Sequence, residues 1–154
     1  VSHRERMDAW MDYDEARDEI KAKNREYLDL FEQDLIAEGL KSNTIKRHLV
    51  NADLYINNFL LYEEPFTMDR GTDRIDSFFE EFFIRKCIWS TPMNIKRTAI
   101  GIKKFYKCMM VHGFVKKVDY EFLCSEIKGG LATWQNDCAA YNDSNQSKSF
   151  SLFF

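Results

Sequence analysis

The residues of this chain best suited to bind a ligand are lysines and arginines, gathered in two segments that contain no acid. Residues 41–50 carry three basic side chains and residues 85–118 carry nine, without one Asp or Glu in either segment. The remainder of the chain is acidic, so the net charge is −3. Because a polyanion responds to the local field rather than to the net charge, these segments predict binding to DNA or RNA.

The second basic segment has the pattern of a helix with one cationic side. At about 100° per residue, the cations between residues 96 and 107 fall within an arc of about 120°, and only Ile100 lies among them. The opposite arc holds the apolar side chains of Ile95, Ala99, Ile102, Phe105, Tyr106 and Met109. A helix face that is merely solvated usually mixes charges of both signs, so a purely cationic face favours phosphate binding.

Two kinds of residue in these segments are predicted to contact nucleic acid. Lysine and arginine side chains pair with phosphate oxygens, whereas hydroxyl, amide and helix-terminal N–H groups donate to phosphates or base edges. The cationic candidates are Lys41, Lys46, Arg47, Lys96, Arg97, Lys103, Lys104 and Lys107. The hydroxyl and amide candidates are Ser42, Thr44, Thr91 and Asn94.

The cysteines are interpreted as structural thiols rather than metal ligands. The four cysteines are Cys87, Cys108, Cys124 and Cys138. None of them lies in a C-x-x-C pair, and we assign none of them a histidine at ligand spacing. We therefore expect no zinc site, no other metal and no cofactor, and we expect the thiols to be reduced.

An enzyme is the function that the residues favour least. His48 lies at the edge of an apolar stripe, where a hydrogen-bonded structural role is expected. The adjacent acid pairs Glu63–Glu64 and Glu80–Glu81 point to different faces of any helix, so they make poor acid–base couples. No catalytic residue and no small-molecule substrate are therefore predicted.

No segment of the chain is predicted to enter a membrane. No apolar run approaches the roughly 18 residues that a membrane helix needs, and the charged N-terminus VSHRERMDAW has no hydrophobic signal region. A basic amphipathic helix can lie on a membrane surface, but the apolar side of residues 95–109 is needed for a core. A cytoplasmic protein is expected.

Long helices joined by short turns are expected because only two prolines and six glycines interrupt the chain. Residues 3–20 form a charged, weakly amphipathic helical segment. Further helices are predicted over residues 24–39, from Ser42 or Asn43 to about 62, from 69–72 to about 86, from 92 to about 112, and from Asp119 onward. Gly39 and Gly113 are predicted helix ends, and Ser90-Thr91-Pro92 a predicted helix start. No strand pattern is present, so the fold class is all-α.

The organisation expected from these elements is a compact bundle of four core helices with additions at both ends. Residues 1–23 form an acidic helical extension, residues 24–118 the bundle, residues 119–142 a C-terminal helix, and residues 143–154 a flexible tail. The C-terminal helix is expected to direct Tyr120, Leu123, Ile127, Leu131 and Trp134 toward the core, and Gly129-Gly130 is a candidate kink or break in it.

Three stretches of the chain resemble a known family. They are FEQDLIAEGLKSNTIKRHLVNADLYINNFL (residues 31–60), the acidic and aromatic residues 72–86, and STPMNIKRTAIGIKKFYKCMMVHGFV (residues 90–115). Their order and spacing are similar to the N-terminal, SAM-like core-binding domain of tyrosine recombinases and phage integrases. The resemblance implies a four-helix module that closes over one face of duplex DNA, with its second and fourth helices facing the DNA.

The family's catalytic residues are not expected in this chain. The resemblance implies that the tyrosine nucleophile, the arginines, the lysine and the His-x-x-Arg pair lie in a second domain, which this chain is too short to contain. The His3-x-x-Arg6 match is read as chance, and Lys117-Val118-Asp119 replaces the family's usual Asn-Pro. The implied function is a non-catalytic duplex DNA-binding module of a site-specific recombinase.

Two further functions remain open from the sequence. A protein-interaction or self-association module, modulating a full-length recombinase, would use the acidic residues 1–40, the Phe-rich residues 72–86 and the terminal Phe153-Phe154. An independent helix-turn-helix regulator would need a short turn between two helices, which the long connection over residues 62–71, containing Pro65, does not supply.

Overall fold

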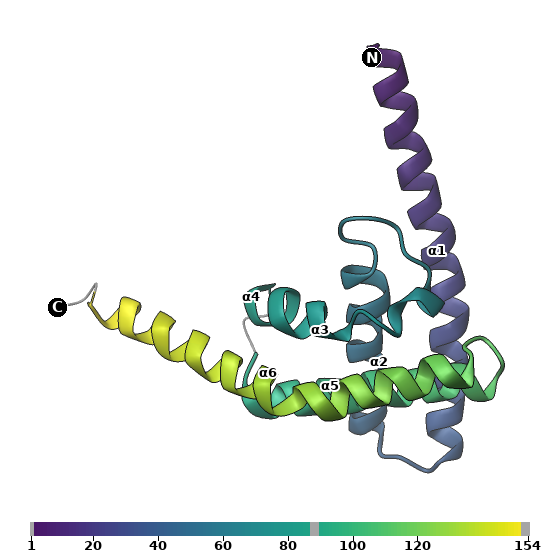
Figure 1. Ribbon diagram of the computed structural model, residues 1–154. Coiled ribbons are helices and arrows are strands. Elements are labelled where there is room, and N and C mark those ends of the chain that lie inside the picture. The colour runs from purple at the N-terminus through teal and green to yellow at the C-terminus, as the bar shows by residue number, and fades with distance from the viewer. Residues whose placement is uncertain (1, 87–89, 152–154) are drawn as a thin grey trace.

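Helices account for all the regular structure of the computed structural model, which describes residues 2–86 and 90–151. The C-terminal half of the first helix, α1, packs with α2, α5 and α6 around one core (Figure 1). The N-terminal half of α1 and the end of α6 project from this bundle in different directions. The all-α bundle expected from the sequence is therefore confirmed. No described helix is long and apolar enough to span a bilayer.

Helix α1 (His3–Ala37) is one continuous helix, so the boundary expected at residue 23 falls inside it. The side chain of Ser2 accepts a hydrogen bond from the Glu5 amide, and the Glu5 carboxylate accepts one from the Ser2 amide. This reciprocal cap fixes the start of the helix. Lys21-Ala22-Lys23 are strong helix formers, which explains why the expected gap between residues 20 and 24 is absent. The helix ends before Gly39, as predicted, where φ is +79°.

Helix α2 (Ser42–Asp53) begins one residue earlier than a serine or asparagine cap would place it. The carbonyl of Lys41 accepts the first helical bond, from the Ile45 amide, so Lys41 is the N-cap, and it makes no side-chain capping bond. The predicted cap at Ser42 or Asn43 is therefore wrong. The helix continues as the wider π-helical turn η1 (Leu54–Phe59), close to the predicted end.

The third predicted helix is divided into short elements. These are the 3₁₀ turn η2 (Met68–Gly71), α3 (Ile75–Ser77), the π-helical η3 (Phe78–Phe83) and α4 (Ile84–Lys86). Two buried tyrosines hold the turn η2 against the core, because their hydroxyls donate to its carbonyls. Tyr55 donates to Gly71 O at 2.5 Å, and Tyr106 donates to Met68 O at 2.7 Å.

The predicted start and end of the next helix, α5 (Pro92–Val111), are confirmed. The Thr91 hydroxyl oxygen accepts a hydrogen bond from the Asn94 amide at 3.1 Å, and Pro92 occupies the first turn. Gly113, with φ of +84°, follows the C-cap His112. These are the ordinary devices that begin and end a helix.

Helix α6 (Lys117–Ser151) begins before the predicted cap Asp119 and continues past residue 142. It passes through Gly129 and Gly130 without interruption, so the candidate break there is wrong. The helix also belongs to the main core rather than to a separate unit: Leu123, Ile127, Trp134 and Cys138 are buried in the same cluster as α1, α2 and α5. The core face predicted for this helix is therefore confirmed at Leu123, Ile127 and Trp134. Cys87 and Phe153-Phe154 lie outside the described residues.

Aromatic side chains fill much of the core, consistent with a composition that includes 13 phenylalanines. The rings of Phe31 and Phe105 meet edge to face with centroids 5.4 Å apart, which joins α1 to α5. Trp134 stacks on Phe79 at 4.7 Å and donates its indole N–H to Asp76 at 3.0 Å, which joins α6 to α3 and η3. Such pairs contribute roughly 0.5–1.5 kcal/mol beyond the area that they bury.

The two adjacent glycines of α6 should respond oppositely to alanine. A Cβ on Gly129 would meet no atom within 4 Å, so Gly129→Ala should stabilise the helix by about 0.5–1 kcal/mol. A Cβ on Gly130 would lie 2.3 Å from Trp134 Cζ2, on a ring held by Phe79 and Asp76, so Gly130→Ala should destabilise by about 1–3 kcal/mol. Urea unfolding measures the free energy of unfolding of both variants. A change of the same sign in both variants would contradict the prediction.

Candidate nucleic-acid interface

The two basic segments meet because α2 and α5 approach each other closely at Gly101. A Cβ on Gly101 would lie 3.2 Å from His48 Nδ1 and 3.4 Å from Asn51 Cβ. Beside this contact, the Thr98 hydroxyl donates to Asn51 Oδ1 at 3.5 Å. A glycine permits this approach because it has no side chain of its own. The outward sides of the two helices therefore form one surface.

The cations of both helices gather along this contact. Arg47 on α2 and Lys104 on α5 both lie close enough to His48 to help lower the pKa of its imidazole, although burial is the larger cause. Arg97 lies four residues before Gly101, and Lys104 three residues after it, so both belong to the side of α5 that borders α2. We call the predicted contact residues of α2 and α5, with Lys41 and Thr91, the basic surface.

The basic surface is accessible to a ligand. Most of its members are exposed, and the partly buried ones are Thr44, Asn94 and Lys104; the exposed ones are Lys41, Ser42, Lys46, Arg47, Thr91, Lys96, Arg97, Lys103 and Lys107. Among the described residues, Lys104 is the one cation of this set that pairs with an acid, Glu38 Oε2 at 3.3 Å. The acidic residues 1–40 therefore leave most of the surface unneutralised.

The hydroxyl and amide candidates differ in what they can offer. Thr91 and Asn94 already form the capping bond of α5, and this bond occupies the Thr91 oxygen as an acceptor while leaving its hydroxyl proton. Ser42 and Thr44 lie in the first turn of α2, which carries no acid and no side-chain cap. The free N–H groups of that turn and the two hydroxyls are donors suited to a phosphate.

Exposed apolar side chains lie between the cations of α5. Ile100, which the sequence places among the cations, is 44% exposed, and Met93 is 57% exposed. At about 100° per residue both lie between two rows of cations. The row that borders α2 contains Arg97 and Lys104, and the row on the other side contains Lys96, Lys103 and Lys107. The surface thus has a narrow apolar centre with cations on both sides.

His48 is buried beneath this surface, with 4% of its area exposed. Its Nδ1 has no hydrogen-bond partner in the described part of the chain, so the hydrogen-bonded role predicted for it is not made through that atom. Burial is the main cause that lowers the pKa of the imidazole, and the charges of Lys104 and Arg47 act in the same direction. The ring is therefore held neutral between two cations.

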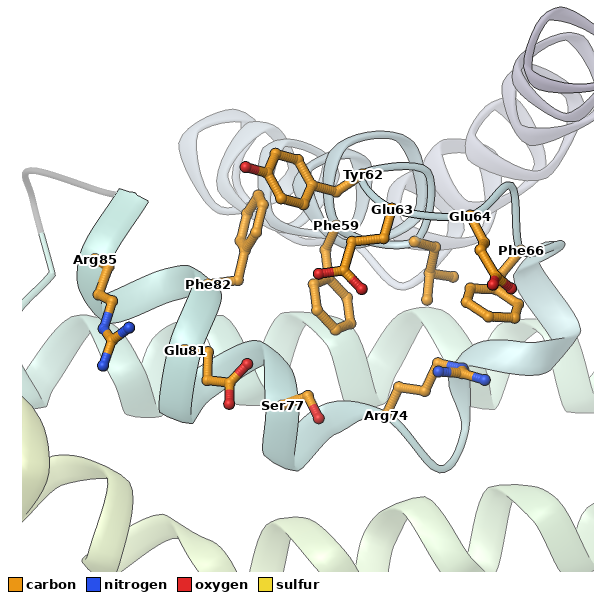
Figure 2. Close-up of a pocket in the computed structure, with 11 residues that line it drawn as sticks. Phe59, Tyr62, Glu63, Glu64, Phe66, Arg74, Ser77, Glu81, Phe82 and Arg85 are labelled. Atoms are coloured by element: carbon orange, nitrogen blue, oxygen red, sulfur yellow. The ribbon is translucent and has the colours of Figure 1, made fainter. Parts of the chain in front are cut away.

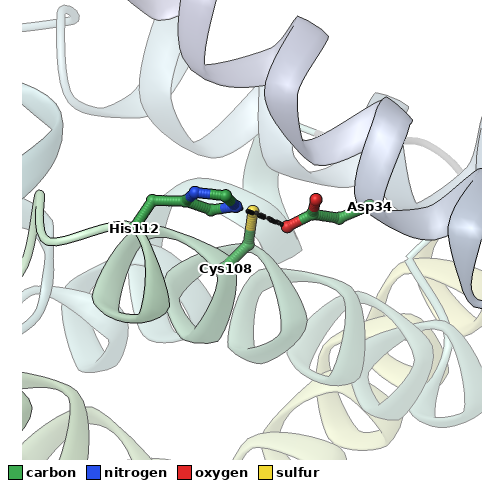
Figure 3. A group of neighbouring side chains, drawn as sticks. All are labelled: Asp34, Cys108 and His112. Carbon is green, nitrogen blue, oxygen red and sulfur yellow. Dashed lines mark hydrogen bonds and ion pairs between the residues drawn. The ribbon is translucent and has the colours of Figure 1, made fainter.

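One group of side chains that could bind a metal ion was not predicted from the sequence. Cys108 and His112 are four residues apart on α5, and the Asp34 carboxylate of α1 points toward both of them (Figure 3). Asp34 Oδ2 is 2.8 Å from His112 Nε2 and 3.1 Å from Cys108 Sγ. The prediction that no cysteine has a histidine at ligand spacing is therefore wrong, because two residues at positions i and i+4 of a helix lie on the same face. The Cys108–His112 spacing could have revealed this pair from the sequence. Nothing in the sequence indicates that Asp34 lies beside the pair.

Asp34 and Cys108 have pKa values shifted from their usual ones. Hydrogen bonds from Cys108 and His112 lower the pKa of Asp34. Burial, together with the neighbouring Asp34 carboxylate, raises the pKa of Cys108 to about 12. The carboxylate therefore stays ionised near neutral pH, while the thiol keeps its proton.

A cavity of about 440 Å³ lies away from the basic surface, beside η1 and η3 (Figure 2). Phe59, Tyr62, Phe66 and Phe82 line it, together with acids and arginines from the same segments. Arg74 lies over the ring of Phe66, with the guanidinium carbon 3.7 Å from the ring centroid. No predicted contact residue lines this cavity, so it is separate from the basic surface.

Comparison of the chain with models of protein families, with curated proteins and with solved structures finds no match.

The buried His48 should make the folded protein less stable in mild acid. Its pKa is lower in the folded state than the value of about 6.5 in an unfolded chain, so between those two values the unfolded state binds more protons. Stability should therefore fall as the pH drops below about 6.5. We expect the thermal midpoint to decrease between about pH 7.5 and pH 5.5, and His48→Gln to reduce that decrease. The exposed His3 provides the control, since His3→Gln should leave the pH dependence intact.

Proposed function

We propose that this protein binds duplex DNA without cleaving it, and that α2 and α5 contact the phosphate backbone. The observation that carries the proposal is the Gly101 contact, which brings two acid-free basic segments, far apart in the chain, onto one accessible surface. Phosphate contacts of this kind supply most of the sequence-independent affinity of DNA-binding proteins.

The dimensions and chemistry of α5 suit a DNA groove. A helix of 20 residues is about 30 Å long, and a major groove about 12 Å wide admits a helix. The two rows of cations would reach the phosphates on either side of the groove. Ile100 and Met93, between the rows, would meet base edges, where a thymine methyl group is a suitable apolar partner.

Among the described residues, the basic surface offers no suitable nucleophile for strand cleavage. Tyr106, the tyrosine of α5, is fully buried and donates its hydroxyl to Met68 O. Burial raises the pKa of Tyr106, which opposes formation of a phenolate. The role that remains for α5 is binding.

The resemblance to tyrosine recombinases supports the same orientation. In the order of the core helices, α2 is the second and α5 the fourth, and these are the helices that face DNA in the family's core-binding module. We therefore propose that the chain acts as the binding half of a site-specific recombinase. Helix α6 departs from the family pattern, because it packs into the core where a linker would be expected.

Binding to duplex DNA should depend strongly on salt. If about six phosphates are contacted, the logarithm of the association constant should fall with that of the salt concentration with a slope of about −5. The double variant Lys103→Glu with Lys104→Glu should lose at least about 10-fold in affinity for every duplex and flatten the slope by about 2. Arg47→Glu should act in the same direction from α2. Fluorescence anisotropy with labelled duplexes of several sequences measures all of these.

The matched control is Lys21→Glu with Lys23→Glu on the acidic part of α1, which makes the same change in net charge away from the basic surface. This variant should keep most of the affinity. An equal loss in both double variants would assign the binding to net charge. A flat salt response, or no binding to any duplex, would overturn the proposal.

A second candidate function, self-association, is favoured by the projecting half of α1. Trp10 is 68% exposed and Met11 64% exposed, on a segment that extends beyond the bundle (Figure 1). A large apolar side chain on an acidic arm suits an apolar contact with a second copy of the chain, whose basic surface would complement the acids.

Light scattering distinguishes this candidate from the first. Self-association predicts a stable dimer without affinity for duplex DNA, and Trp10→Glu should return it to a monomer because it places a charge in the apolar contact. A monomer that binds duplex DNA with the salt dependence given above would exclude the candidate.

A further inference from the structure

The last turns of α1 and α5 bring together three side chains of types that bind metal ions. Asp34 comes from α1, and Cys108 and His112 come from successive turns of α5 (Figure 3). One oxygen, one sulfur and one nitrogen of these side chains all lie within 4.8 Å of one another. Both elements are long helices packed in the core, so the positions of the three side chains are set by the fold.

We infer that Asp34, Cys108 and His112 form a zinc-binding site whose fourth ligand is water. Thiolate, imidazole and carboxylate are the ligands that Zn²⁺ takes in proteins, whereas Mg²⁺ and Ca²⁺ prefer sites made of oxygen alone. Three protein ligands with an open position for water are typical of zinc sites that bind or activate a further group. This inference does not depend on DNA binding.

The spacing of the three atoms suits a tetrahedral ion. Around Zn²⁺, with bonds of about 2.0–2.3 Å, neighbouring ligand atoms lie about 3.3–3.6 Å apart. The distances from Asp34 Oδ2 are 2.8 Å to His112 Nε2 and 3.1 Å to Cys108 Sγ. They are shorter because hydrogen bonds occupy the place of the metal. Replacing those bonds by zinc requires the carboxylate oxygen to move away from the nitrogen and the sulfur by about half an ångström. Asp34 and His112 are partly exposed and can make this shift, whereas Cys108 is buried and fixed by the core.

The electrostatic surroundings favour a cation. The C-terminal end of a helix carries a partial negative charge, which basic residues in the last turn usually offset. Neither α1 nor α5 has a basic residue in its last turn, although both end here. Asp34 adds a full negative charge between them. A bound divalent cation would therefore neutralise two helix ends and a carboxylate together.

The proton balance of binding follows from the hydrogen bonds. Zinc would replace the thiol proton of Cys108, giving a Zn–S bond and one proton released to solvent. Asp34 is already ionised. The Nε2–H of His112 donates to Asp34, so zinc can bind Nε2 only when that proton is exchanged through solvent for one on Nδ1, which leaves the ring neutral and the net release at one proton. Because the thiol must lose its proton to bind zinc, affinity should rise with pH. The carboxylate and the thiolate together balance the charge of the ion.

The test uses untagged full-length protein, freed of metal with a chelator. We expect it to bind one equivalent of Zn²⁺ in competition with a chromogenic chelator. With Co²⁺ in place of Zn²⁺, it should show a thiolate-to-cobalt charge-transfer band. Cys108→Ser should abolish the band and lower zinc affinity by roughly 100-fold, and His112→Gln should weaken binding to a similar extent. Cys124→Ser, which changes a thiol of α6 outside the cluster, is the matched control and should bind as the original protein does.

Asp34→Asn keeps the size of the side chain and removes its charge, so it tests the site without a large change in packing. Zinc should raise the thermal midpoint of the original protein and of Cys124→Ser but not that of Cys108→Ser or Asp34→Asn. Absence of stoichiometric zinc binding would overturn the inference and show that the three side chains form only a hydrogen-bonded contact between α1 and α5. Unchanged binding in Cys108→Ser and Asp34→Asn would overturn it equally. Neither result bears on DNA binding, which is measured separately.

Discussion

The burial of one whole side of α5 is the constraint on which the rest of the structure depends. Helices α1, α2 and α6 all pack against α5, and Ile102, Phe105 and Met109 have no exposed area. A charged side chain is too costly to place in that core without a partner. The cations of α5 are therefore restricted to its outward side, and the packing that stabilises the bundle also exposes the basic surface.

The position of α2 follows from the same packing. Gly101 lets the backbones approach, so that His48 and Asn51 of α2 lie directly against α5. The approach places a neutral imidazole beneath Arg47 and Lys104, where an anion bound above them would stabilise the protonated ring. The proposed binding of a polyanion would therefore be coupled to stability and to the protonation of His48 through this one helix–helix contact.

The ends of α1 and α5 add a second constraint. Helix α1 crosses the bundle and ends beside the C-terminus of α5, where Asp34 meets Cys108 and His112 and Glu38 meets Lys104. These polar contacts tie the N-terminal helix to the central one, and Lys104 is the one cation of the basic surface that they use among the described residues. The projecting half of α1 makes fewer contacts with the bundle, and this leaves Trp10 exposed.

The sequence by itself determined the features that are local to one helix. The cap at Thr91-Pro92, the ends at Gly39 and Gly113, the aromatic core positions and the single cationic side of α5 all follow from backbone preferences and a period of about 3.6 residues. Only the tertiary structure decided which helices meet: the inclusion of α6 through Trp134 and Phe79, the junction of α2 with α5, and the place of Asp34 beside Cys108 and His112. Such contacts join residues distant in the chain, and they depend on how whole side-chain surfaces fit together. A sequence pattern within one segment does not indicate which other segment packs against it.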